Sequence, residues 1–258
     1  MKKVLLIVAA VVMSAISLSA QDLAQATETY NNGAMELQMG NNAAALEHFQ
    51  NALTMAESLG DDATDLVNNC KKAICSVSLS IAKDLYNSKD FDGAIAAFGK
   101  AKENADNYGE AEIASEAEEL LGQTWKLKYN TDAKEAMKAK DFAKAAENFK
   151  KVLELDPENG NTAIQLGQAY MKGGKFDDAL QALEVAKANG QEDNAVKVIS
   201  QIYLMKAQSA LKAKKYQEVI DMAAKSNEAL ENANAYKLSA SAAQKLGKNE
   251  ECIALYEK

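Results

Sequence analysis

The side chains that could carry out chemistry are few, and they do not form a catalytic or metal-binding set. His48 is the single histidine, and Cys70, Cys75 and Cys252 are the three cysteines. A zinc site needs several histidine or cysteine ligands at characteristic spacings, which these residues lack. Neither a nucleophilic serine motif nor a cysteine–histidine arrangement is present. The sequence therefore predicts a protein that is not an enzyme and that binds no metal or cofactor.

Two short segments superficially resemble ligand loops. Residues 156–161 contain oxygen-bearing side chains, but they lack the alternating ligands and the twelfth-position glutamate of a calcium loop. Gly173, Gly174 and Lys175 lack the four-residue spacer and the following Ser or Thr of a phosphate loop. Both segments are interpreted as turns between helices.

The cysteines, the single histidine and the single tryptophan are interpreted as structural residues that take no part in chemistry. Cys70 and Cys75 are five residues apart, which places them on different sides of one helix and disfavours a disulfide. Together with Cys252 they are predicted to be small buried hydrophobic residues. His48 is predicted at the surface or at the core boundary. Trp125 is predicted in the core, with an exposed anchor for a partner as the alternative.

The elements that would position these residues follow from a recurring turn. Each copy ends in a small residue, such as Ala145, and most carry a large apolar residue four positions later, such as Phe149. This spacing places both on one face of a helix. Another helical pattern precedes each turn, so each repeat has a first helix before the turn and a second helix after it. Gly167 lies inside one of the first helices and indicates close helix packing. The turns lie at residues 40–45, 89–94, 140–145, 174–179, 214–219 and 247–252.

These repeats resemble the tetratricopeptide repeat family over residues 24–258. The strongest match carries the sole proline, Pro157, where the family ends its second helix. The residues in register over two repeats are Ala145, Phe149, Leu155, Asp156, Pro157, Leu166, Gly167, Tyr170, Phe176 and Ala179. The resemblance implies an all-α solenoid of about six helical hairpins wound into a right-handed superhelix. The additional residues 59–70 and 103–125 are interpreted as lengthened helices.

The N-terminus has the layout of a secretory signal peptide. Two lysines precede the apolar run from Val4 to Met13, and small residues follow up to Ala20. We therefore predict a signal peptide at residues 1–20, a repeat domain at 21–258, and an exported protein that is periplasmic or secreted. The alternative is a retained segment that tethers the chain to a membrane.

The charge of the chain argues against nucleic acid as a partner. The formal net charge is −8, and removal of residues 1–20 would leave 27 lysines against 37 acidic groups, a charge of −10. Such a chain gains little from counterion release on nucleic acid. It also contains no arginine, so the planar fork that binds phosphates in a bidentate manner is absent.

The resemblance places a partner in the concave groove that the first helices of such arrays line. The positions carried over lack acidic residues, and they are Tyr30, Lys83, Tyr86, Asn130, Lys134, Met137, Gln168, Met171 and Gln208. Methionine and aromatic side chains offer adaptable apolar contact, and lysines attract acidic groups. The prediction is a scaffold or adaptor of the bacterial cell envelope that binds a protein segment. A carboxylate clamp is not expected, because Lys83, Lys134 and Gln168 stand where its asparagine would lie.

A different class of function is kept as the alternative. The chain could bind a small ligand or glycan as a component of an outer-membrane complex. Such a ligand would need a deep pocket, which we place near Trp125, Tyr129 and Tyr108.

The last helix suggests a further contact. It begins near Glu250 and leaves Ile253, Leu255 and Tyr256 without a following helix to cover them. We predict that this end self-associates or docks to another protein. The alternative is that the sequence is cut short.

Overall fold

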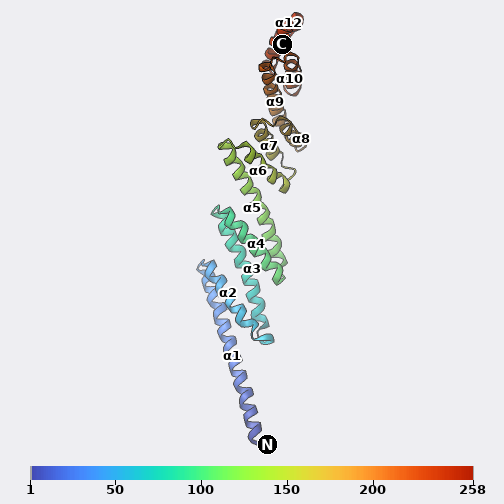
Figure 1. The fold of residues 1–258 in the computed structure, drawn as a ribbon. Coiled ribbons are helices and arrows are strands. Elements are labelled where there is room, and N and C mark those ends of the chain that lie inside the picture. The colour runs from blue at the N-terminus through green and yellow to red at the C-terminus, as the bar shows by residue number, and fades with distance from the viewer. Residues whose placement is uncertain (1, 258) are drawn as a thin grey trace. The chain divides into compact units, whose positions relative to one another are not determined.

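The chain folds into helices throughout the part that its computed structural model describes, residues 2–257, with side chains described for residues 20–255 and 257. No strand occurs in that part, which confirms the predicted all-α class. The helices are α1 (Lys2–Gln38), α2 (Asn42–Glu57), α3 (Thr64–Asn87), α4 (Phe91–Tyr108), α5 (Ala111–Lys138), α6 (Phe142–Leu155), α7 (Gly160–Lys172), α8 (Phe176–Ala188), α9 (Glu192–Lys212), α10 (Tyr216–Ala229), α11 (Ala233–Lys245) and α12 (Asn249–Tyr256), shown in Figure 1.

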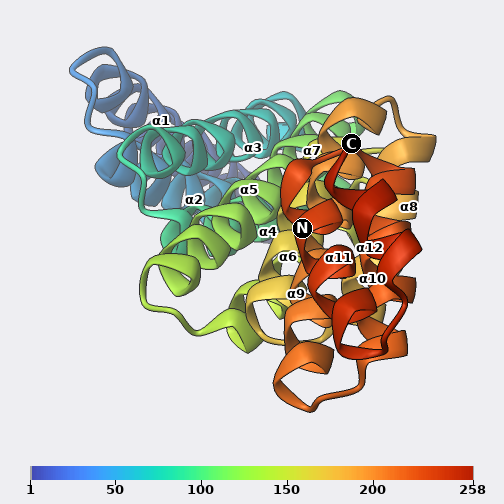
Figure 2. The same ribbon diagram turned by 90° about the horizontal axis from the view of Figure 1, so that it is seen from above.

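The helices group into two compact units, Met1–Trp125 and Lys126–Lys258. Unit 1 contains α1 to α4 and the first part of α5, and unit 2 contains the rest of α5 and α6 to α12. Within each unit, every second helix packs along the first helix that precedes it, as α10 does against α9 (Figure 2). The predicted helical-hairpin repeat is therefore the architecture of the chain.

All six predicted turns share one backbone feature. Each turn contains a residue with positive φ just before the second helix begins, and these residues are Gly40, Lys89, Lys140, Gly174, Lys214 and Gly247, with φ between 57° and 80°. Glycine adopts this left-handed conformation freely, whereas a lysine there costs about 1 kcal/mol. Because this geometry is common to all six turns, each second helix reverses direction relative to its first helix in the same way.

Side-chain caps fix several helix starts. Asp90 and Asp141 accept hydrogen bonds from the backbone N–H of Gly93 and Lys144, at 3.0 and 3.1 Å. Asn159 caps α7 in the same way. Each such cap satisfies a backbone donor that has no partner within the helix and contributes about 1 kcal/mol.

The predicted packing residues form the core of each unit. The small residue that closes each turn is buried, from Ala45 at 0% exposure to Cys252 at 9%. Four of the large residues that follow four positions later are also buried, namely Phe49, Phe98, Phe149 and Leu183, none of them more than 1% exposed. Alternating small and large side chains allow neighbouring helices to approach closely without leaving voids.

The longer intervals of the repeat have two different origins. Residues 103–125 extend α4 and α5, and α5 reaches 28 residues, as predicted. Residues 59–70 contain the 3₁₀ helix η1 (Gly60–Ala63) as well as the start of α3, which is 24 residues long. The prediction of lengthened helices is therefore confirmed, with one short 3₁₀ turn added.

The predicted signal peptide lies largely outside the described side chains. Helix α1 begins at Lys2 and continues to Gln38, while the side chains of residues 1–19 are not described. In the portion of the chain open to that test, no helix has the length and apolar character needed to cross a membrane. Cleavage after Ala20 and retention as an anchor both remain predictions.

Gly167 provides a sensitive test of the packing. A Cβ at this position would lie 2.8 Å from Cγ of Leu183, whereas a Cβ at Gly122 in α5 would meet no atom within 4 Å. We expect Gly167→Ala to destabilise the chain by about 1 kcal/mol or more, because overpacking outweighs the gain in helix propensity. We expect Gly122→Ala to stabilise it by up to about 1 kcal/mol. Urea unfolding followed by circular dichroism measures the free energy of unfolding of both variants. If both substitutions changed it in the same direction, this account of the contact between α7 and α8 would be contradicted.

Candidate interaction surface on the first helices

The predicted groove residues of unit 1 are engaged with neighbouring side chains. Tyr30 packs against Phe49, with ring centroids 5.1 Å apart, and Tyr86 contacts Phe98 edge to face at 6.5 Å. Nζ of Lys83 lies 2.6 Å from a carboxylate oxygen of Glu116. The two tyrosines are half-buried and Lys83 is neutralised locally, so this part of the predicted groove offers limited free surface.

In unit 2 the predicted residues differ in accessibility. Lys134 and Gln208 are exposed and Gln168 is half-buried. Met137 is half-buried against the core, and Oδ1 of Asn130 is buried without a hydrogen-bond partner. Met171 is only 5% exposed and packs in the core, which leaves its side chain little area for a partner.

Neighbouring first helices of unit 2 touch each other. Helix α7 contacts α9, and α9 contacts α11, in addition to the contacts within each hairpin. Ala133 and Ala136 of α5 share a core cluster with Leu166 and Ala169 of α7. No contact of this extent joins α8 with α10 or α10 with α12 in the described residues. The first helices therefore form the more closely spaced layer of unit 2 and present one continuous face.

The exposed and half-buried positions of this face recur at the same register in each first helix. In α7 they are Asn161, Gln165, Gln168 and Lys172, spaced by four, three and four residues, which places them on one side of the helix. We call the full set the first-helix stripe: Leu127, Thr131, Lys134, Lys138, Asn161, Gln165, Gln168, Lys172, Gln201, Met205, Gln208, Lys212, Asn234, Leu238, Ser241 and Lys245. None of these side chains is buried and none is acidic.

The last position of the stripe is a lysine in all four helices. These residues are Lys138, Lys172, Lys212 and Lys245, the lysine row, and each stands in the last turn of its helix. All four are exposed, and none forms an ion pair with a described residue. A cation at a helix C-terminus is favoured by the helix dipole, which gives the row a structural origin.

The two edges of unit 2 carry opposite charges. The edge with the lysine row comprises residues 138–141, 172–178, 212–218 and 245–251, which contain nine lysines and six acidic residues. The opposite edge comprises residues 155–161, 188–194 and 229–234, which contain five acidic residues and no lysine. An acidic chain thus presents a basic border along one side of its first-helix face.

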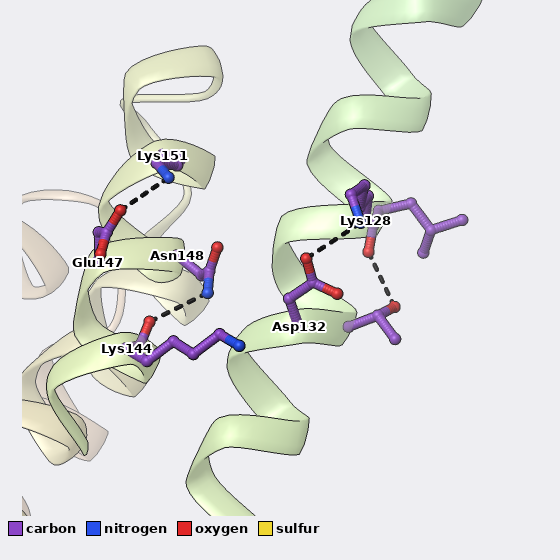
Figure 3. A network of polar contacts seen from close by, with 8 residues as sticks. Lys128, Asp132, Lys144, Glu147, Asn148 and Lys151 are labelled. Atoms are coloured by element: carbon purple, nitrogen blue, oxygen red, sulfur yellow. Dashed lines mark hydrogen bonds and ion pairs between the residues drawn. The ribbon is translucent and has the colours of Figure 1, made fainter. Parts of the chain in front are cut away.

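A charged network on α5 and α6 lies beside the stripe (Figure 3). Lys128 pairs with Asp132 at 3.3 Å, and Lys151 pairs with Glu147 at 2.8 Å. The side chain of Lys144 extends toward α5 (Figure 3), and both it and Asp132 line a hollow of about 430 Å³. Because both signs of charge line this hollow, it offers no strong preference for an anion or a cation.

The residues proposed for a small-ligand pocket are divided between the two units. Tyr108 and Trp125 belong to unit 1 and Tyr129 to unit 2. Tyr108 lies beneath Nζ of Lys71, and Tyr129 lies beneath Nζ of Lys151, at 5.6 and 5.4 Å from the ring centroids. Trp125 is half-buried. The larger hollows of unit 2, of about 510 Å³, are lined by other residues.

The predicted C-terminal contact surface is partly described. Ile253 is 61% exposed, while Leu255 packs against the small cluster of Ala240, Ala243 and Cys252. The side chain of Tyr256 lies outside the described residues. Self-association through this helix remains a prediction.

Comparison with known proteins finds a family match for part of the chain. Residues 136–202 match the family described as tetratricopeptide repeat. This match agrees with the resemblance that the residues of these repeats carry. A comparison with curated protein sequences finds no match.

Several solved structures show a looser likeness to the chain. MamA is 20% identical, with 71% of this chain and 88% of that chain covered and a TM-score of 0.33. PilW, a type IV pilus biogenesis factor, is 15% identical, with 89% and 90% covered and a TM-score of 0.34. The TPR2AB domain of yeast Sti1 in complex with pHSP90 is 14% identical, with 91% and 98% covered and a TM-score of 0.28.

The lysine row and the charge difference between the edges were not predicted from the sequence. Both can be found by aligning the repeats on the residue that closes each turn, since Lys138 and Lys172 stand seven residues before Ala145 and Ala179. The same offset leads to Lys212 and Lys245. The signal was therefore present but becomes visible only when surface positions are compared between repeats.

The three cysteines are buried and free, as predicted. Burial raises the pKa of the Cys70 and Cys75 thiols to about 11, with smaller contributions from Glu57 and Glu110 respectively. In the described part of the chain, no group of His, Cys, Asp or Glu side chains is placed to hold a metal ion. Cys70 and Cys75 are therefore packing groups in the protonated form at neutral pH.

The raised pKa predicts slow thiol chemistry in the native chain. At pH 8 the thiolate fraction of Cys70 and Cys75 should be about a hundredfold lower than in the unfolded chain, and burial slows attack further. We expect both to remain unmodified by a thiol-reactive disulfide reagent while all three cysteines react in denaturant. Peptide mapping by mass spectrometry identifies the labelled positions, and rapid native labelling of Cys70 would contradict the prediction.

Proposed function

We propose that the chain is a non-enzymatic scaffold or adaptor that holds a protein segment against the first-helix face of unit 2. Tetratricopeptide repeats are interaction scaffolds, and this chain carries them over residues 136–202. The proposal assigns no catalytic step to the chain.

The observation that carries the proposal is the continuity of the first-helix stripe. The amides of Gln165, Gln168 and Gln208 can each donate and accept hydrogen bonds, so they suit the backbone of an extended segment. Leu127 and Met205 add apolar contact within the same stripe. Contacts α7–α9 and α9–α11 keep the helices adjacent, so a segment can cross several repeats without a gap.

We further propose that the chain works in the bacterial cell envelope after export. The supporting observation is the sequence of the first 20 residues, with two lysines, an apolar run and small residues before Gln21. A retained N-terminal segment would instead tether the same scaffold to a membrane.

Site-specific photocrosslinking tests the proposed face. A photoreactive amino acid replaces Gln168 in the stripe or, as a matched control, Gln181 on the exposed side of α8. In native cell envelopes we expect one dominant crosslinked protein from position 168 that is absent from position 181. Identical crosslinks from both positions, or crosslinks from position 181 alone, would contradict binding at the first-helix face.

Export has its own test. Intact-mass measurement of the protein isolated from an envelope fraction is expected to show a chain that begins at Gln21, because Ala20 ends the small-residue segment. A chain that retains residues 1–20 in that fraction would indicate the tethered form. A full-length chain in the cytosolic fraction would contradict export.

A further inference from the structure

The lysine row gives the first-helix face a chemical preference. We propose that this face of unit 2 binds an extended protein segment that carries Asp or Glu at every third position, each carboxylate facing one lysine of the row. This inference rests on the proposed scaffold function and specifies the chemistry of the partner segment. The row consists of Lys138, Lys172, Lys212 and Lys245.

The charges around the row leave it available. Of the acids on the same edge, Asp141 caps α6, Asp177 pairs with Lys206 at 3.1 Å, and the two acids Glu218 and Glu251 pair with lysines of their own turns. Asp178 and Glu250 are exposed at the starts of α8 and α12. They reduce the positive charge of the edge but form no ion pair with the row among the described residues.

The opposite edge reinforces the preference. Its acids include Glu158, Glu192 and Glu231, and no lysine occurs among residues 155–161, 188–194 and 229–234. A fourth acid of this edge, Asp156, pairs with Lys126 of α5 at 3.8 Å. An acidic segment would be repelled from that edge and attracted toward the row. The segment is therefore expected to cross the first helices near their C-terminal ends.

The spacing follows from helix packing. Helices in contact lie about 8–10 Å apart, so consecutive lysines of the row are separated by about that distance. An extended or polyproline II chain advances about 3.1–3.4 Å per residue, so three residues span about 9–10 Å. Polyproline II also has three residues per turn, which directs every third side chain to the same side. Acids at every second residue would fall out of register after one helix.

A protein segment fits the face better than other polyanions. The middle positions of the stripe are mostly uncharged, and their amides, such as Gln165, Gln168 and Gln208, match a peptide backbone. The chain has no arginine and a net charge of −8, both unfavourable for nucleic acid.

Two peptides of equal composition test the spacing directly. Each has ten residues and four glutamates, placed at every third position in one peptide and at every second position in the other. With mature protein at low ionic strength, we expect the first peptide to bind about fivefold or more tightly by fluorescence anisotropy, and its affinity to fall as salt is added. Equal affinities would overturn the proposed register.

Paired variants locate the binding site. Lys172→Glu with Lys212→Glu is expected to weaken binding of the first peptide about tenfold or more. Lys150→Glu with Lys225→Glu makes the same change of charge on exposed positions of α6 and α10 and is expected to weaken it less than threefold. Circular dichroism verifies that each variant is folded, and the peptide comparison on the parent protein does not depend on any variant. Equal weakening by both pairs would overturn the assignment to the row.

Two further outcomes separate this inference from the scaffold function. If neither peptide binds while Gln168 still crosslinks to a partner, the scaffold function stands and the acidic segment is overturned. Row-dependent binding to vesicles containing phosphatidylserine, without binding of the first peptide, would overturn a protein segment in favour of an anionic membrane surface.

Discussion

Every hairpin of the chain depends on the close approach of two helices at the residue that closes the turn. Ala145 and Ala179 are fully buried at these points, and the larger Phe149 and Leu183 fill the space one helical turn further on. A larger side chain at the closing position would separate the helices and move every group that their faces present. The surface described for unit 2 therefore depends on small residues in its interior, since these fix how closely each first helix packs against its second helix.

This dependence explains which features could be predicted from the sequence. The four-and-three spacing around Ala145, the single proline at Pro157 and the glycine at Gly167 each have a direct structural meaning, so the hairpins and their turns followed from local patterns. The contact at Gly167 confirmed the close packing in detail, because its neighbour is Leu183 at the predicted large position. The 3₁₀ helix η1 lies at the turn signal Gly60-Asp61-Asp62, but its 3₁₀ form could not be predicted because a single turn leaves no periodic pattern.

The candidate site was harder to predict because accessibility depends on neighbouring helices. Met171 and Gln168 both fall on the first helix of their repeat, yet α9 covers Met171 and leaves Gln168 half-buried. The sequence near Lys83 does not reveal its ion-pair partner, because that partner, Glu116, lies 33 residues further along the chain. A single-repeat pattern assigns a residue to a helix and approximately to a face, whereas its charge environment is decided by residues from other repeats.

The turns show how such a scaffold can change its chemistry without changing its fold. Lysine occupies the left-handed position at Lys89, Lys140 and Lys214, where glycine stands at the other three turns, and the backbone follows the same path in all six. The hairpin therefore tolerates a residue that is unfavourable at that position at a cost of about 1 kcal/mol, small beside the free energy of a buried core. Substitutions at these turns can thus add or remove charge at the border of the molecule without changing the packing of its interior. Related arrays could therefore diverge in their partners while conserving every helix.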